Sequence, residues 1–148
     1  MRVWVLVAVL ALVACGQRGK SQAAGKDYLQ EVQQVLQELR VLDQQVAVQV
    51  TADTLDSSSI VPLIRQRYQP ALAELRQRVS GLKPDSAFAA VNQQLLRYLD
   101  LRLHAYDLAI QGEREQRQEL FEEFSALQVQ ADAVGRRLEE ELRQARHK

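Results

Sequence analysis

The sequence predicts an all-α fold, specifically an antiparallel up-down four-helix bundle. From residue 26 onward, apolar residues recur at spacings of three and four, which is the period of amphipathic helices. No segment has the alternating β-branched pattern of a strand, and glycine and proline stand almost only where the helical period breaks. Four amphipathic helices joined by short connections favour antiparallel neighbours around one core. We therefore expect the bundle to occupy residues 26–148.

The first helical segment ends in a loop at residues 51–59, where two aspartates and three consecutive serines interrupt the period. Ser59 is expected to cap the next helix and Pro62 to lie in its first turn, where its missing N–H costs nothing. Glutamines crowd the first segment; such a neutral polar face could dock another helix or reflect compositional drift. The apolar residues are Tyr28, Val32, Val35, Leu36, Leu39, Leu42 and Val46, and the glutamines are Gln30, Gln33, Gln34, Gln37, Gln44, Gln45 and Gln49.

The second helical segment has Pro70 in its interior. Proline removes a backbone donor and clashes with the preceding turn, so the sequence predicts either a kink or a break into two shorter helices near Gln69. Gly81 and Pro84 mark the end of the segment. Its apolar stripe consists of Ile60, Ile64, Tyr68, Ala71, Leu72, Leu75, Val79 and Leu82.

The third helix is predicted at residues 86–111, with Asp85 or Ser86 as its cap and a turn at residues 111–113. Its two adjoining apolar stripes indicate that it touches more than one neighbour. The fourth helix keeps a near-heptad row, which favours packing at shallow angles. The stripes of the third helix are Val91, Leu95, Tyr98, Ala105 and Ala109, and Phe88, Leu96, Leu99, Leu103, Tyr106 and Ile110; the row of the fourth is Leu120, Phe124, Leu127, Ala131, Val134, Leu138 and Leu142.

The N-terminus has the layout of a secretory signal, because Arg2 precedes an uncharged apolar run over residues 3–14. A helix needs roughly 20 residues to span the hydrocarbon core, so an uncleaved span is disfavoured by length. The run ends in Leu12-Val13-Ala14-Cys15, which resembles the lipobox of bacterial lipoproteins. That resemblance implies removal of residues 1–14, a diacylglyceryl group on the Cys15 thiol, and in some cases acylation of the new amine.

A lipid on Cys15 would hold the protein on a membrane. One acyl chain gives only marginal binding, at about 0.8 kcal/mol per buried CH₂, so stable anchoring needs the two chains of a diacylated cysteine. Cys15 is also the only cysteine; a plain secretory signal that happened to end there would leave a reactive unpaired thiol. Residues 15–25 are small and polar and predict a flexible tether that holds the bundle about 15–20 Å off the bilayer. The expected location is the cell envelope, at the outer membrane of a Gram-negative cell or the outer face of a Gram-positive plasma membrane.

The charge balance argues against nucleic acid as a partner. The chain has 19 basic and 19 acidic side chains. Removal of residues 1–14 takes away only Arg2, which leaves 18 basic against 19 acidic side chains and a net charge of −1. The sequence therefore offers neither the clustered basic face expected for nucleic acid nor polybasic reinforcement of membrane binding.

Asp100, His104 and Asp107 are the best candidates for metal ligands, because i, i+4 and i+7 share one face of a helix. That face also carries Arg97 and Gln111, which indicates that it meets solvent. Bundle metal sites use inward-facing Glu-x-x-His motifs, which are absent, and a structural zinc needs four protein ligands. No serine lies in a nucleophile motif, and no glycine-rich phosphate loop is present. We expect no metal, no cofactor and no enzymatic activity.

Charged residues are spread at helical surface spacing, which is typical of a solvated face. Favourably ordered i,i+4 pairs would contribute about 0.3 kcal/mol each. The predicted pairs are Glu74 with Arg78, Glu113 with Arg117, and Glu139 with Arg143.

The leading interpretation is a non-enzymatic envelope lipoprotein whose bundle binds another envelope protein near the membrane. It depends on the anchor, on the absence of a catalytic motif, and on an apolar surface of the third helix wider than one contact needs. The alternative is a small-ligand carrier or sensor with a pocket inside the bundle near Tyr68, Tyr98 and Tyr106. These tyrosines and Tyr28 lie on apolar stripes, where such rings more often pack in the core.

Overall fold

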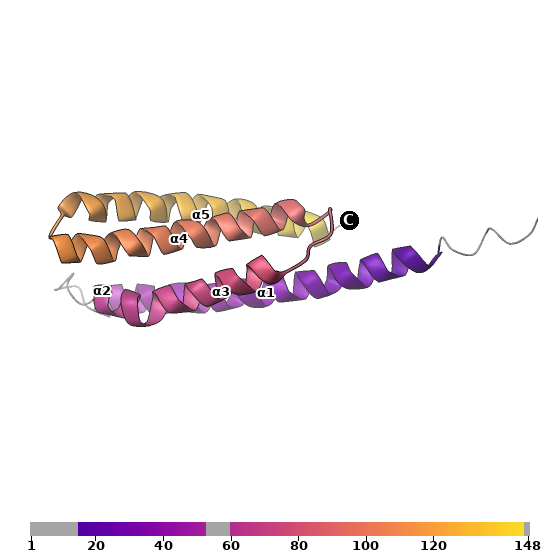
Figure 1. The fold of residues 1–148 in the computed structure, drawn as a ribbon, viewed down its shortest axis with the longest axis horizontal. Helices are drawn as coiled ribbons and strands as arrows, with labels where there is room; N and C mark the ends of the chain where they lie inside the picture. The colour runs from indigo at the N-terminus through magenta and orange to yellow at the C-terminus, as the bar shows by residue number, and fades with distance from the viewer. Residues whose placement is uncertain (1–14, 53–59, 147–148) are drawn as a thin grey trace, which may run out of the picture.

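A computed structural model describes residues 15–52 and 60–146, which form an all-helical bundle (Figure 1). Helices α2, η1 and α3 follow one another without a gap, so four helical rods run up and down in antiparallel order. The predicted four-helix bundle is confirmed. The elements are α1 (Cys15–Ala52), α2 (Ile60–Leu63), the π-helical turn η1 (Ile64–Tyr68), α3 (Gln69–Gly81), α4 (Ala89–Glu115) and α5 (Gln118–Arg146).

The rods bury their apolar residues in a single core, and α4 contributes from both of its predicted stripes, for example Tyr98 and Leu99. In α1 the buried residues recur at spacings of four, three and four, and α4 contacts both α3 and α5. None of the described helices combines the length and the hydropathy needed to cross a bilayer. The most deeply buried large side chains are Val32, Val35, Val61, Ile64, Tyr68, Val79, Leu95, Leu99 and Leu138.

Helix α1 starts at Cys15 and therefore includes residues 15–25, for which composition predicted a flexible tether. Packing explains where α1 joins the bundle. Gly25 is buried so close to α4 that an added Cβ would lie 3.1 Å from Phe88 Cε2, and the rings of Tyr28 and Phe88 stack with centroids 5.3 Å apart. A helix fixed at this point extends toward its N-terminus at one hydrogen bond per residue. In Figure 1, α1 continues past the end of the bundle where α5 ends.

The second rod passes through Pro70 without a break. Pro70 lies in the first turn of α3, where a missing N–H is tolerated, and the preceding turn is widened into η1. In that turn the Gln69 N–H donates to the carbonyl of Ile64, five residues back. The break considered for Gln69 is therefore wrong. Pro62 lies in α2 and the rod ends at Gly81, as predicted. Of the loop expected at residues 51–59, residues 51 and 52 belong to α1, and residues 53–59 with the expected cap Ser59 lie outside the described residues.

The N-cap of α4 is Phe88, which makes no side-chain cap hydrogen bond, so the predicted cap at Asp85 or Ser86 is wrong; Asp85 instead closes the turn before the helix. Its Oδ1 accepts hydrogen bonds from the backbone N–H groups of Ala87 at 3.0 Å and Phe88 at 3.3 Å, and the helix begins at Ala89. The end of α4 differs from the prediction, because the helix runs through residues 111–113 to Glu115. Gly112 is buried there, and an added Cβ would lie 2.9 Å from Phe121 Cε2 on α5. The glycine serves close packing of α4 against α5 and makes no turn.

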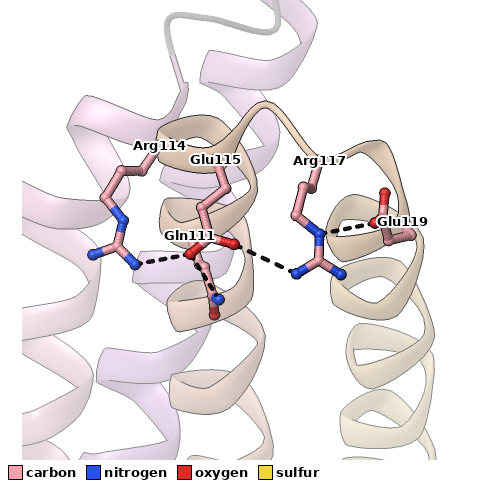
Figure 2. A network of polar contacts seen from close by, with 5 residues as sticks. All are labelled: Gln111, Arg114, Glu115, Arg117 and Glu119. Carbon is pink, nitrogen blue, oxygen red and sulfur yellow. Dashed lines mark hydrogen bonds and ion pairs between the residues drawn. The ribbon is translucent and has the colours of Figure 1, made fainter.

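The turn between α4 and α5 lies at Gln116, whose φ of 54° is left-handed. The Gln116 N–H donates to the Glu113 carbonyl at 3.3 Å and the Arg117 N–H to the Gly112 carbonyl at 3.0 Å, the pattern of a Schellman motif. Figure 2 shows that Glu115 accepts hydrogen bonds from Gln111, Arg114 and Arg117 at this tip. These hydrogen bonds lower the pKa of the Glu115 carboxyl, and the bond from Arg114 has the largest effect on it.

The three predicted i,i+4 ion pairs do not form among the described residues. Arg78, Glu113 and Glu139 instead pair with a charge on a neighbouring rod, whereas Arg117 and Arg143 pair with a nearby residue in the chain. The observed pairs are Arg78 with Glu38 at 2.8 Å, Arg65 with Glu113 at 3.5 Å, Arg40 with Glu139 at 3.2 Å, Arg117 with Glu119 at 2.8 Å, and Arg143 with Glu140.

Candidate functional site

An open groove of about 460 Å³, here called the α1–α3 groove, follows the seam between α1 and α3. Its lining includes apolar side chains from both helices: Leu75 is 2% exposed and closes the floor, whereas Val41 is 46% exposed. Polar side chains complete the lining. The groove is lined by Gln34, Gln37, Glu38, Val41, Leu42, Ala71, Glu74 and Leu75.

The seam continues into a second hollow of about 530 Å³ that shares Glu74 with the groove. Arg78 bridges the seam by donating to both carboxylate oxygens of Glu38, at 2.8 and 3.0 Å, and lies 3.7 Å from Glu31. The hydrogen bond to Glu38 raises the pKa of Arg78. Among the described residues Glu74 has no ion-pair partner. The second hollow is lined by Glu31, Glu74, Gln77, Arg78, Gly81 and Leu82.

The glutamine-rich face of α1 coincides in part with this seam. Gln34 and Gln37 line the α1–α3 groove, and both are exposed. When a partner covers the groove, neutral amides beside the apolar floor cost less to remove from water than a row of charged side chains would. The sequence pattern thus pointed to the surface without showing that a hollow lies beside it.

A second polar feature lies inside the bundle around Arg102 of α4, whose side chain is only 13% exposed. The guanidinium donates to Asp43 Oδ1 of α1 at 2.6 Å, to the Tyr98 hydroxyl at 3.1 Å and to Gln128 of α5. It also lies 5.4 Å from the centroid of the Tyr98 ring. Burial opposes its charge, but Tyr98 and Asp43 outweigh that effect and raise the pKa of Arg102.

This network ties α1, α4 and α5 together through one guanidinium. Its chemistry is therefore that of a buried, hydrogen-bonded charge that fixes the alignment of three rods. Sequence analysis missed Arg102. The signal was its place in the stripe Val91, Leu95, Tyr98, Ala105 and Ala109, where position 102 completes the alternating four-and-three spacing and carries a charge.

The four tyrosines are core residues. Tyr68, Tyr98 and Tyr106 are 1%, 8% and 3% exposed, and none of them lines the α1–α3 groove or the other described hollows. Burial raises the pKa of the Tyr106 hydroxyl to about 12 and also raises that of Tyr98. The Tyr68 hydroxyl is buried without a hydrogen-bond partner in the described part of the chain. The tyrosines are close enough to influence one another electrostatically, but they enclose no described pocket.

Asp100, His104 and Asp107 lie exposed on one face of α4, as predicted, but they do not converge on a point. Asp100 pairs with Arg76 of α3 at 2.5 Å, and Asp107 accepts a hydrogen bond from Gln69 Nε2 at 2.5 Å. Both carboxylates are thus engaged with α3. Within residues 15–52 and 60–146 no group of three acidic, histidine or cysteine side chains is placed to hold a metal ion.

Cys15, the predicted lipid attachment site, is the first residue of α1, and residues 12–14 before it lie outside the described part of the chain. The α1–α3 groove and Cys15 are therefore carried by the same helix. Comparison of the chain with protein-family models, with curated proteins and with solved structures finds no match.

Proposed function

We propose that this chain is a lipid-anchored protein of the bacterial cell envelope whose helical bundle binds another envelope protein and catalyses no reaction. The lipobox-like Leu12-Val13-Ala14-Cys15 supports the anchor. The single observation that carries the binding role is the α1–α3 groove, because an apolar floor left open along two helices can receive a partner's side chains.

The position of the groove relative to the anchor limits which partners it can meet. Glu38 in the middle of the groove lies 23 residues after Cys15 on the same helix, which corresponds to about 35 Å along the axis at 1.5 Å per residue. A helical segment over residues 15–25 spans about 15 Å, so it holds the groove at much the same height as the expected tether of about 15–20 Å would. A partner must reach that height above the same membrane.

Photocrosslinking in living cells tests the binding role. A photoreactive amino acid at Gln37 in the groove is expected to crosslink to a discrete envelope protein, identified by mass spectrometry. The matched control is the same amino acid at Gln130, an exposed glutamine on α5, which should not give that product. Absence of a product at Gln37, or the same product at both positions, would overturn the binding role.

The anchor is tested separately with Cys15→Ser. Metabolic labelling with an alkyne analogue of a fatty acid should mark the native chain, whereas the variant should lose both the label and the removal of residues 1–14. The physical reason is that only the thiol can receive the thioether-linked diacylglyceryl group. A variant that is processed normally would refute the anchor without touching the binding role of the groove.

A further inference from the structure

We propose that the α1–α3 groove receives an amphipathic helix whose apolar stripe is flanked by lysine or arginine. The inference rests on the proposed binding role and goes further by specifying the chemistry of the partner. In the resulting complex the partner would lie along the seam as a fifth helix.

The length of the seam suits a helix. The groove and the adjoining hollow extend along α1 from Glu31 to Leu42, a rise of about 16 Å or three helical turns. Two neighbouring antiparallel rods leave a straight furrow between them, and a third helix packs into such a furrow with its side chains between theirs. A single loop or a small ligand would fill only part of that length.

The apolar content of the seam suits a narrow stripe of partner side chains. Leu42 and Leu82 are half-buried and pack on the core, so they form its floor together with Leu75. Val41 is 46% exposed, and Val48, seven residues later on the same face of α1, is 65% exposed. Exposed valines one heptad apart match the repeat with which a docked helix presents apolar residues.

The charge of the seam specifies the flanks of the partner. Its lining holds the three carboxylates of Glu31, Glu38 and Glu74 against the one guanidinium of Arg78, an excess of two negative charges. Arg78 is already engaged with Glu38 and Glu31, so Glu74 is the carboxylate that a partner's cation can reach. Lysine or arginine beside the partner's apolar stripe would complement this rim.

The same observations argue against two other occupants. Anionic lipid headgroups would be repelled by the acidic rim. A second copy could offer Val129, which is 66% exposed on α5. A contact between the groove of one copy and α5 of another is heterologous, however, so it would link copies into a ring or an open-ended chain rather than a symmetric dimer.

Binding of two designed peptides to the full lipidated protein in detergent tests the inference. Each peptide is a fluorescein-labelled helix of about 18 residues with one leucine stripe, flanked by lysine in one and by glutamate in the other. Fluorescence anisotropy should show the lysine-flanked peptide binding at least about tenfold more tightly. Raising the salt concentration should narrow that difference, because the rim charges are exposed.

Charge reversal at the rim locates the site. Glu74→Lys should weaken binding of the lysine-flanked peptide about five- to tenfold and favour the glutamate-flanked one. Glu122→Lys is the matched control, because it makes the same charge change on an exposed position of α5 and should leave both affinities unchanged. Circular dichroism confirms that both variants are folded.

Equal binding of the two peptides, or an equal effect of Glu74→Lys and Glu122→Lys, would overturn the inference. If Gln37 still crosslinks to a discrete envelope protein in that case, the binding role stands and only the partner's chemistry is wrong. A Gln37 product that proves to be a second copy of the chain would overturn both.

Discussion

The backbone of Gln116 is strained in the turn that joins α4 to α5. Its φ of 54° lies where side chains with a Cβ cost about 1–2 kcal/mol relative to the right-handed region. Glycine is relieved of that cost but loses more entropy on folding, so Gln116→Gly should raise the free energy of unfolding by about 1 kcal/mol. Chemical denaturation followed by circular dichroism measures the change.

The matched control is Gln130→Gly, an exposed glutamine inside α5 with ordinary helical geometry. There the same substitution should lower the free energy of unfolding by about 1 kcal/mol. Loss of stability in both variants would show that Gln116 is not strained.

The stability of the bundle should depend more on the partly buried Arg102–Asp43 pair than on an exposed ion pair. The two groups are 2.6 Å apart and the Arg102 side chain is 13% exposed, so Asp43→Asn leaves a largely desolvated cation whose remaining carboxylate partner, Asp132, lies 3.9 Å away. Because Asp43 itself is 43% exposed, water softens the loss, and the expected destabilisation is about 1–2 kcal/mol. In the Arg102→Met background the same substitution should cost much less.

The exposed Arg76–Asp100 pair is the control for this double-mutant cycle of Asp43 and Arg102. Its side chains are 46% and 52% exposed, so Asp100→Asn should change stability by less than about 1 kcal/mol. Additive effects of Asp43→Asn and Arg102→Met in thermal or chemical denaturation would contradict a coupled buried network.

At the residue scale the sequence predicted which side chains are apolar and buried, but not how polar groups are satisfied. Tyr98 was expected on a core stripe and is there. That Arg102 shares its core with Asp43, 59 positions away, depends on how α1 aligns with α4. Periodicity within one helix contains no information on that alignment. The ion pairs across seams were missed for the same reason.

At the scale of elements, Gly112 is required by the approach of α4 and α5. An added Cβ would lie 2.9 Å from Phe121 Cε2 and 3.3 Å from Leu120 Cβ. We expect Gly112→Val to lower the free energy of unfolding by about 1–3 kcal/mol through overpacking. Denaturation midpoints measure the effect, with Gly81→Val as control because nothing lies within 4 Å of a Cβ at Gly81. Equal losses in the two variants would contradict the packing role.

Glycine and proline each have more than one structural use, and this limited the prediction of element boundaries. Glycine often ends a helix, so Gly112 was predicted to lie in a turn. The turn is instead made by Gln116 in the left-handed conformation, which the residue type glutamine does not predict. Pro70 looked like an interruption, and the chain absorbed it by widening the preceding turn into η1. The existence and order of the helices were predictable, because those follow from the period alone.

For the whole molecule, α4 and α5 form the closely packed half of the bundle, and α1 joins it from far away in the chain. Small residues allow the close approach: Gly135 of α5 would place a Cβ 3.2 Å from Tyr98 Cε2, and Ala105 and Ala131 are fully buried. Helix α1 meets its neighbours through larger side chains and through ion pairs at its seams. The α1–α3 groove lies at one of those seams, so its shape follows from the way α1 packs against α3.

The buried tyrosines connect the stability of the whole bundle to alkaline pH. Burial raises the pKa of Tyr28 and of Tyr106 from 10 to about 12, since the phenolate is poorly solvated in the core. Between these values the unfolded chain releases protons that the folded chain retains, so stability is complete below about pH 10 and falls as the pH rises toward 12. Each shift corresponds to roughly 2–3 kcal/mol at the upper end of that range. Urea denaturation at pH 8, 10 and 11 should therefore show a steep loss above pH 10, and Tyr106→Phe should make the loss shallower because one titrating group is gone. An identical pH dependence in Tyr106→Phe would show that its hydroxyl is solvated and that the core around it admits water.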